Sequence, residues 1–426
     1  MYYKKVVGAT LVAVVLLCGI FTSCGPASGG GGAEFEVIRQ AADAYLSSGK
    51  ADDTINGTEL NAILSDDDPT NDPRVLSVRD NKQYSLGHIC GARSAPWRQL
   101  FITLNPDRFD KWFTDQEVDG ITWSGDNKQV VVYSYTGQEG GGQTTAFLNM
   151  LGWDAINLKW GYNCWQFCPN ASPGAFIEAS SGLGTVIDGV GFNAVGQNYK
   201  TETTVNEATK EYPFPVVENT SSDDEFEIIR AAAAAWTQSK EPLPVNYQGR
   251  KEDFDEFTDP DIYPKDLFNL LTDTNRNNDP FVLSVQEAEL YAKGHVPGAV
   301  HIPLTDVAKL ENLHKLPTDR QIVVVSTTGQ SGNQVAGILR LLGYEATNLL
   351  FGMTGWTYDE EVAPGRFHIW EEDGVTFKDV LSFQFCWIDL YVTSNVIPVP
   401  EDWEPPSYEL EEGEEEQEEM PDPWEF

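Results

Sequence analysis

The strongest constraint on the fold is an internal repeat that runs through most of the chain. Residues 35–45 return as residues 226–236, with apolar side chains at helical spacing in both copies. Three further segments recur in the same order: 72–79 as 279–286, 84–92 as 291–299, and 147–153 as 338–344. Because each copy alternates helical segments with short apolar runs, the pattern predicts two α/β domains, each a parallel sheet flanked by helices.

The repeat and the changes in composition predict where the domains begin and end. With 426 residues and 41% hydrophobic content, the chain can bury more than one core. The predicted parts are a signal peptide at 1–23, a Gly/Ser tether at 24–33, a first domain at 34–200, a polar linker at 201–223, a second domain at 224–397 and an acidic, disordered tail at 398–426.

The N-terminus has the order of a secretory signal. Lys4 and Lys5 precede an apolar stretch at 6–21, and Ser23 precedes Cys24. This order resembles a bacterial lipoprotein signal, in which the cysteine after the cleavage site receives the lipid, whereas an ordinary cleaved signal peptide is the alternative. The resemblance implies a lipid on Cys24 and a place in the cell envelope, on the periplasmic face or at the outer membrane.

The charge balance restricts the partners. The formal net charge is −38, which argues against nucleic acid and against a bare anionic membrane surface. The membrane partner is therefore expected to be reached through the lipid anchor alone. A basic protein, or a small anion at the predicted loops, remains open as a further partner.

Four cysteines follow Cys24, namely Cys90, Cys164, Cys168 and Cys386. In an oxidising compartment they could form no, one or two disulfides, and the spacing leaves the pairing open. The spacing of Cys164 and Cys168 suits a small disulfide loop better than zinc, since no histidine lies nearby. We therefore predict no metal and no cofactor.

Two matching loops carry the candidate site. Each follows an apolar run, at 130–133 or 322–325, and precedes a helical stretch, so its backbone N–H groups can gather at a helix N-terminus and hold an anion. The predicted anion-binding residues are Ser134, Tyr135, Thr136, Gly137 and Gln138 in the first loop and Ser326, Thr327, Thr328, Gly329 and Gln330 in the second.

The order of motifs resembles a tandem rhodanese-like protein. Gly-His-(Ile/Val)-x-Gly-Ala stands at 87–92 and again at 294–299. A strand ending in the candidate loop, a helix, Leu-Gly-(Trp/Tyr) and a final tryptophan complete the pattern in each copy. The resemblance implies a five-stranded parallel sheet wrapped by helices, with the loop cradling a sulfur atom or an oxyanion.

The chain departs from that family at the nucleophile. In the family a cysteine starts the loop, accepts a sulfane sulfur as a persulfide and passes it on, but Ser134 and Ser326 stand here. A hydroxyl cannot form a persulfide, and neither loop offers it a base. The resemblance gives His88 and His295 a structural role in a turn. We therefore predict no catalytic residue in either loop.

Basic residues of the family are also partly lost. The loop arginine of many members is Glu139 in one copy and Ser331 in the other. Arg79 at the end of the first strand is kept in the first copy and becomes Gln286 in the second. If either loop binds an anion, we expect it to be the first, with Arg79 contributing.

These observations lead to one main function and two alternatives. The main prediction is a lipid-anchored, exported, catalytically degenerate protein that binds a small anion, a sulfur species or a protein partner through its former active loops. The first alternative is an active sulfurtransferase with a displaced thiol, Cys90 or Cys164, whose segments neighbour the loop in the family fold. The second is a structural or adhesion module of the cell envelope.

Overall fold

The protein was analysed as a computed structural model. It describes residues 32–66, 68–114, 127–138, 140–165, 198–239, 261–357, 359–364, 367–372 and 375–380. The predictions for the signal peptide, Cys24, Glu139, Cys168, Cys386 and the acidic tail lie outside these residues.

The first repeat forms a five-stranded parallel sheet in the order β1-β5-β4-β2-β3. Its strands are β1 (Thr54–Ile55), β2 (Arg74–Ser77), β3 (Arg93–Ser94), β4 (Val130–Tyr133) and β5 (Ala155–Leu158). Its helices are η1 (Lys50–Asp52), α2 (Gly57–Leu64), α3 (Asn81–Leu86), α4 (Trp97–Thr103), α5 (Pro106–Thr114), α6 (Gly140–Met150) and η2 (Gly161–Cys164). Every residue of β2 and β4 is buried, as expected where helices cover both faces of a sheet.

The second repeat has the same topology, in the order β6-β10-β9-β7-β8. Its strands are β6 (Asp261–Ile262), β7 (Phe281–Ser284), β8 (Val300–His301), β9 (Ile322–Val325) and β10 (Ala346–Leu349). Its helices are α10 (Pro264–Thr272), α11 (Ala288–Lys293), η3 (Leu304–Asp306), α12 (Leu310–Leu313), α13 (Gln330–Leu341) and α14 (Gly352–Trp356). An antiparallel hairpin, β11 (Phe367–Glu372) with β12 (Val375–Val380), follows.

The predicted fold class is confirmed, and so is the five-stranded parallel sheet that the resemblance implied. The two predicted amphipathic helices are present as α1 (Gly32–Ser47) and α9 (Glu225–Gln238).

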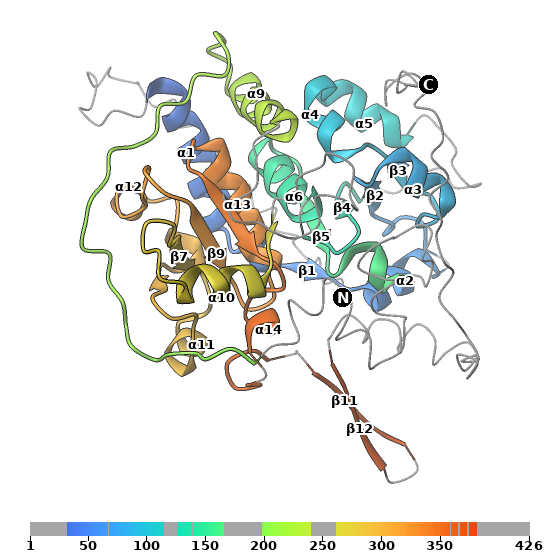
Figure 1. Cartoon of the computed structure of the whole chain (residues 1–426). Helices are drawn as coiled ribbons and strands as arrows, with labels where there is room; N and C mark the ends of the chain where they lie inside the picture. Colours follow the sequence, from blue (N-terminus) through green and yellow to red (C-terminus); the bar gives the residue numbers. More distant parts are fainter. Residues whose placement is uncertain are drawn as a thin grey trace, which may run out of the picture.

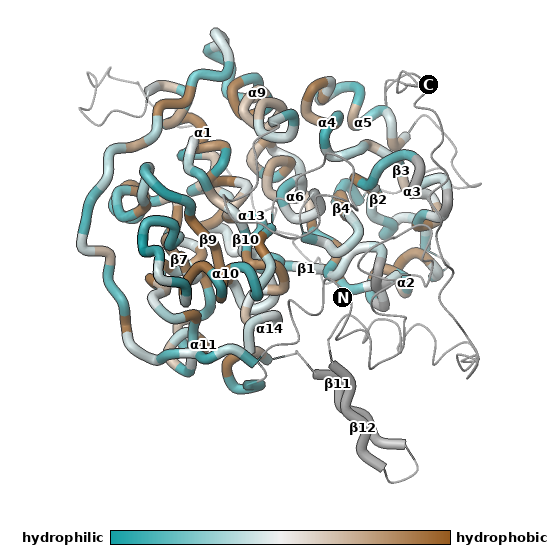
Figure 2. Tube along the Cα trace, in the orientation of Figure 1, coloured by the Kyte–Doolittle hydropathy of each residue, from teal (hydrophilic) through white to brown (hydrophobic). Residues whose placement is uncertain are grey.

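The largest hydrophobic cluster belongs to both repeats at once. It takes its members from α1, α6, α9 and α13 and from the inner faces of both sheets, and its buried strand residues include Val132 and Val324. Figure 1 shows α6 and α13 between the two sheets with α1 and α9 next to them, and Figure 2 shows apolar residues along the strands and these helices. Two smaller clusters cover the outer face of one sheet each. The two repeats therefore share one core.

Helix α1 opens the first repeat in sequence but also contacts the second. The guanidinium of Arg39 donates to the carbonyl oxygen of Ala308 at 3.3 Å. The hydroxyl of Ser47 donates to the carbonyl oxygen of Thr305, also at 3.3 Å. An intrahelical ion pair with Glu36, at 2.7 Å, orients Arg39.

Helix α9 makes the reciprocal contact on the first repeat. Its Arg230, paired with Glu227 at 2.7 Å, donates to the carbonyl oxygens of Phe101 and Ile102 at 2.8 and 3.1 Å, at the end of α4. Arg39 and Arg230 hold the same position in the repeat, so the opening helices cross over symmetrically. An amphipathic pattern predicts a helix but not the sheet against which its apolar face packs.

The predicted linker is fastened to the second repeat and, farther along, to α1. Glu202 pairs with His295 in an isolated antiparallel bridge, and the ring of Phe214 stacks on that of His314 at 3.9 Å between centroids. Farther on, the carboxylate of Glu34 in α1 accepts the N–H groups of Asn219 and Thr220. Figure 1 shows this segment, in green, passing around the outside of the second repeat toward α9.

We predict that Arg230→Ala lowers the free energy of unfolding by about 2 kcal/mol, because two backbone carbonyls lose a charged donor. Urea denaturation followed by circular dichroism measures the change. The control is Arg276→Ala, whose side chain is 66% exposed beside Asp279 and should change stability by less than about 0.5 kcal/mol. Equal effects of the two substitutions would contradict a structural role for the exchanged helix.

Candidate functional site

The first candidate loop turns the chain from β4 into α6. Ser134 is 4% exposed, and its hydroxyl accepts the N–H of Gly137 at 3.1 Å while donating to the carbonyl oxygen of Gln138 at 2.9 Å. Gly137 has φ +72°, and a Cβ there would lie 2.5 Å from the carbonyl oxygen of Leu158. Both the left-handed backbone and the space therefore require glycine. The serine hydroxyl closes the loop on itself.

The second loop has the same construction. Ser326 is 1% exposed, and its hydroxyl accepts the N–H groups of Gly329 at 3.0 Å and Gly332 at 3.1 Å. The expected gathering of N–H groups at a helix N-terminus is present, and a serine oxygen of the same chain receives these bonds.

The first loop reaches into the second repeat through Gln138, whose side chain is fully buried. Its Oε1 accepts the backbone N–H of Phe351 at 3.0 Å and an N–H of the Asn348 side chain at 3.3 Å. Asn348 belongs to β10, next to the strand that ends in Ser326. Gln138 thus occupies the base of the opposite loop.

Gln330 of the second loop makes the mirror contact and is 3% exposed. Its Oε1 accepts an N–H of the Asn157 side chain at 2.7 Å, and its Nε2 donates to the carbonyl oxygen of Thr136 at 3.4 Å. The two candidate loops therefore face each other at the contact between the repeats.

The helices behind the loops pack with equally close contacts. A Cβ on Gly142 of α6 would lie 2.7 Å from the side-chain oxygen of Asn333 in α13, and one on Gly337 would lie 2.8 Å from the side chain of Gln143. Gln143 also accepts the indole N–H of Trp236 at 2.7 Å, from the exchanged helix α9. Small residues let α6 and α13 approach, so the loops at their N-termini meet.

Arg79 lies beneath the first loop and is 1% exposed. It donates to the carbonyl oxygen of Gly87 at 2.6 Å, and its guanidinium carbon lies 3.9 Å from the ring centre of Tyr162. Gln286, the matching residue, donates to the carbonyl oxygen of Gly294 in the same turn of the second repeat. Both residues tie the end of the first long strand to a turn, and a role of Arg79 in anion binding stays a prediction.

Tyr135 covers Arg79 from the loop side, with the guanidinium 6.0 Å from its ring centre. Its hydroxyl donates to the carboxylate of Asp80. Burial raises the pKa of Tyr135, and the negative charge of Asp80 raises it further. Tyr135 therefore packs over Arg79 and bonds to Asp80.

The two histidines of the repeated turn bond within that turn. Nδ1 of His88 lies 3.0 Å from the carbonyl oxygen of Tyr84, and Nδ1 of His295 lies 2.8 Å from that of Tyr291. Each ring also stacks on the same tyrosine. These contacts agree with the structural role that the resemblance implied.

The structure separates Cys90 from the loops. Cys90 lines a pocket with Asp72 and Arg74 at the start of β2, whereas Ser134 follows β4, whose last residue pairs with the last residue of β2 in parallel. The two residues therefore lie near opposite ends of the strands. The expectation that Cys90 neighbours the loop is wrong. The segment of Cys164 does lie against the loop, because Tyr162 N–H donates to the carbonyl oxygen of Ser134 at 2.8 Å.

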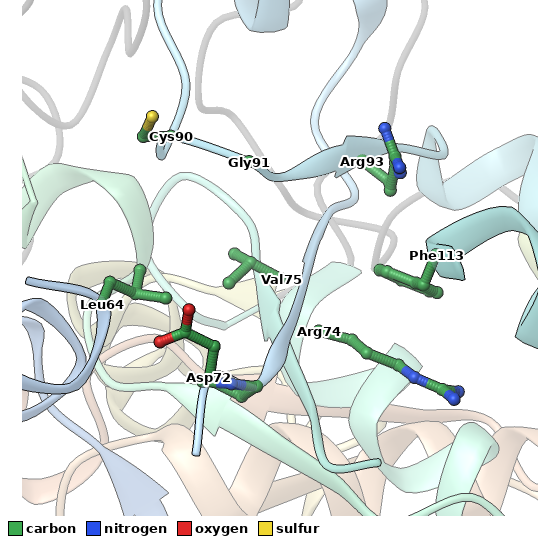
Figure 3. A pocket seen from close by; sticks show the side chains of 9 residues that line it. Leu64, Asp72, Arg74, Val75, Cys90, Gly91, Arg93 and Phe113 are labelled. Atoms are coloured by element: carbon green, nitrogen blue, oxygen red, sulfur yellow. The ribbon is translucent and has the colours of Figure 1, made fainter. Parts of the chain in front are cut away.

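Cys90 is a free, exposed thiol that lines a pocket together with Asp72, Arg74 and Arg93, as Figure 3 shows. Both arginines are almost fully buried, and Arg74 pairs with Asp110 at 2.6 Å. Burial raises the pKa of Asp72, and nearby carboxylates raise it further.

The described residues form neither a metal-ligand cluster nor a membrane-spanning helix. Among them, no three His, Cys, Asp or Glu side chains are grouped so as to hold a metal ion. No helix in the described part of the chain is long and apolar enough to cross a bilayer.

Comparison with known proteins agrees with the repeat. A family model described as "Rhodanese-like domain" matches residues 57–168 and 264–359, so α1 and α9 lie outside both matches. The "Putative sulfur carrier protein YrkF" of Bacillus subtilis is 35% identical over 77 residues, which cover 18% of this chain and 40% of that protein. The "Putative sulfurtransferase YtwF" of the same organism is 30% identical over 76 residues, which cover 18% of this chain and 72% of that protein.

Two solved structures are also similar. A thiosulfate sulfurtransferase from Pseudomonas aeruginosa is 14% identical over 75% of this chain and 68% of its own, with a TM-score of 0.21. A rhodanese-like domain protein from Staphylococcus aureus is 19% identical over 26% of this chain and 90% of its own, with a TM-score of 0.20.

Sequence reasoning identified the loops but missed their cross-contacts. Asn157 and Asn348 are not among the predicted site residues, although each is an amide at the third position of a four-residue strand. A buried polar residue at the same position of both copies was the available signal, since it needs a hydrogen-bonding partner.

We predict that Gln138→Ala lowers the free energy of unfolding by about 2 to 4 kcal/mol, because the Phe351 N–H and the Asn348 amide lose a buried acceptor. Urea denaturation measures the loss. Gln40→Ala serves as the control, since Gln40 is exposed and its amide bonds only to Glu36 one helical turn away. An unchanged unfolding midpoint for Gln138→Ala would show that the crossing contact does not hold the repeats together.

Proposed function

This chain belongs to the rhodanese-like domain family, and from that premise we propose that it is a non-catalytic tandem member whose two former active loops join the repeats to each other. Its role is that of a binding or scaffold protein. A lipid on Cys24 would hold it in the cell envelope, a proposal that rests on the order of charged, apolar and small residues at the N-terminus.

The observation that carries the proposal is the crossing of Gln138 and Gln330 between the loops. Each glutamine oxygen receives N–H groups from the opposite repeat, and both serines are buried within their own loops. A loop used in this way has little access for a small anion or for a sulfur donor. Of the functions considered, this geometry favours the scaffold over anion binding at Ser134 and Ser326.

Family membership and the names of the relatives support a sulfur-related role at a coarser level. Persulfide chemistry needs a thiolate, which a serine does not supply. We therefore propose that neither loop transfers sulfur, whichever ligand or partner the protein binds.

The first test is transfer of sulfur from thiosulfate to cyanide. We expect no thiocyanate from the wild-type protein and none from a Ser134→Cys, Ser326→Cys variant, because both positions are almost fully buried. The variant is made in a Cys90→Ser background, which removes the exposed thiol. Titration of the native and the denatured protein with a thiol reagent then reports whether the new cysteines are buried.

Each other outcome has a definite meaning. Transfer by the wild-type protein overturns the proposal. Transfer by the cysteine variant alone would mean that the loops open to small anions, which favours anion binding over the scaffold.

A second candidate is sulfur transfer at Cys90, favoured by an exposed thiol in a pocket that Arg74 and Arg93 also line. The Cys90 thiolate would attack the outer sulfur of thiosulfate, the donor S–S bond would break, and sulfite would leave with the electron pair. Cyanide would then remove the outer sulfur from the persulfide as thiocyanate and restore the thiolate.

This candidate predicts that wild-type activity is lost in Cys90→Ser and kept in Cys164→Ser. Mass spectrometry after exposure to thiosulfate should then find one added sulfur on Cys90. An unmodified Cys90 together with a silent assay would exclude the candidate.

A further inference from the structure

The linker runs along the second repeat and pairs with it at two isolated bridges, Glu202 with His295 and Asn206 with Val300. The N–H of Glu202 donates to the carbonyl oxygen of His295, and the N–H of His295 donates back, both at 3.0 Å. Near the start of the linker, Trp356 donates its indole N–H to the carbonyl oxygen of Lys200 at 3.1 Å. We call residues 199–206 the strap.

The imidazole of His295 is fully buried between the strap and α11. Its Nδ1 lies 2.8 Å from the carbonyl oxygen of Tyr291, and its Nε2 lies 3.0 Å from the carbonyl oxygen of Thr204 in the strap. A carbonyl oxygen only accepts hydrogen bonds, so both ring nitrogens must donate for both contacts to form. A neutral imidazole carries one N–H, and only the imidazolium carries two.

A counter-ion stands beside the ring. A carboxylate oxygen of Glu202 lies 3.7 Å from Nε2, and this side chain is 29% exposed. The same carboxylate accepts the N–H of Gly298 at 2.6 Å and an amide N–H of Asn206 at 2.7 Å. Burial opposes ionisation of Glu202, but these hydrogen bonds and the charges of His295 and Lys200 outweigh it and lower its pKa.

The other groups around the ring are aromatic. The ring of Tyr291 stacks on His295 with centroids 3.7 Å apart, and its hydroxyl donates to the carbonyl oxygen of Ala299 at 2.7 Å. Burial raises the pKa of Tyr291, so it stays neutral. His301 of β8 stacks on Tyr291 at 4.7 Å, and its Nε2 lies 2.9 Å from the carbonyl oxygen of Gln286.

We propose that His295 is held as an imidazolium between Tyr291 and Thr204, and that this charge fastens the strap to the second repeat in a pH-dependent way. When the ring loses a proton, one nitrogen lone pair faces a carbonyl oxygen and the attraction to Glu202 disappears. The strap then loosens. Because the linker leads into α9, which packs on the first repeat, this attachment also affects how the repeats are joined.

The two charges give the attachment an upper and a lower limit in pH. The contribution of Glu202 is present above the usual carboxyl range and is lost as the pH falls through its lowered pKa. The contribution of His295 is present while the ring is charged and is lost as the pH rises and the ring deprotonates. We therefore expect the strap to be held most tightly where both groups are charged.

Two measurements on the full chain test the proposal. Nitrogen-15 NMR of the imidazole rings at about pH 6 should find both nitrogens of His295 protonated. Hydrogen exchange at the amides of Glu202 and His295, corrected for the intrinsic rate, should lose protection by about tenfold or more between about pH 6 and pH 9.

Three variants identify the cause. His295→Gln should show weaker protection that no longer depends on this pH range, and Glu202→Gln should reduce the dependence while keeping the shape of the side chain. His88→Gln is the matched control: His88 makes the same Nδ1 contact in the first repeat, and the strap pairs with His295 instead. His88→Gln should leave hydrogen exchange at the strap amides the same as in the wild-type protein.

The proposal fails if the His295 ring carries one proton at about pH 6 while the strap stays protected. It also fails if protection is flat across the pH range in the wild type. Because the ring measurement uses the unmodified protein, a variant that does not fold leaves this test intact.

Discussion

The arrangement of the two repeats depends on a pair of glutamine side chains that cross between two loops. Gln138 and Gln330 are buried, and each accepts N–H groups from an asparagine of the opposite repeat. Such hydrogen bonds contribute about 1 kcal/mol each in net terms, but an amide left without its partner in this interior costs more. The contact therefore fixes one alignment of the repeats more strongly than it stabilises the fold.

The exchanged helices supply the apolar part of the same contact. α1 and α9 lie beside α6 and α13 in one cluster that both repeats share. α1 and α9 lie outside the residues that match the family model, so part of the surface that joins the repeats lies outside the matched segments. Burial of the loops follows from this packing, because α6 and α13 begin at the loops and meet each other through glycines.

Serine at the start of both loops is consistent with this use of the loops. Ser134 and Ser326 accept the N–H groups of their own loops, a role in which a compact hydroxyl forms stronger hydrogen bonds than a thiol. Gln138 and Gln330 show how a residue type can mislead in a sequence. Their position at the end of a predicted anion-binding loop indicated a ligand, whereas their side chains bind the other repeat.

Local patterns were sufficient for the fold class. Helical spacing of apolar residues predicted α1 and α9, and short apolar runs predicted β4 and β9. Both signals are local, because the spacing of apolar residues reflects which faces of a segment are buried. The same patterns placed the candidate loops between a strand and a helix. They could not show that Cys90 and Ser134 lie near opposite ends of the strands, since that follows from strand pairing and from the residues around Cys90.

The sequence by itself determined two α/β repeats, the position of their loops and the absence of a thiol from both. Only the tertiary structure decided that the opening helices exchange, that the loops face each other and that His295 meets a second carbonyl oxygen from the strap. The physical reason is distance along the chain. Periodicity and turn chemistry act over a few residues, whereas Gln138 meets Phe351, and Arg39 meets Ala308, through contacts that no local pattern encodes.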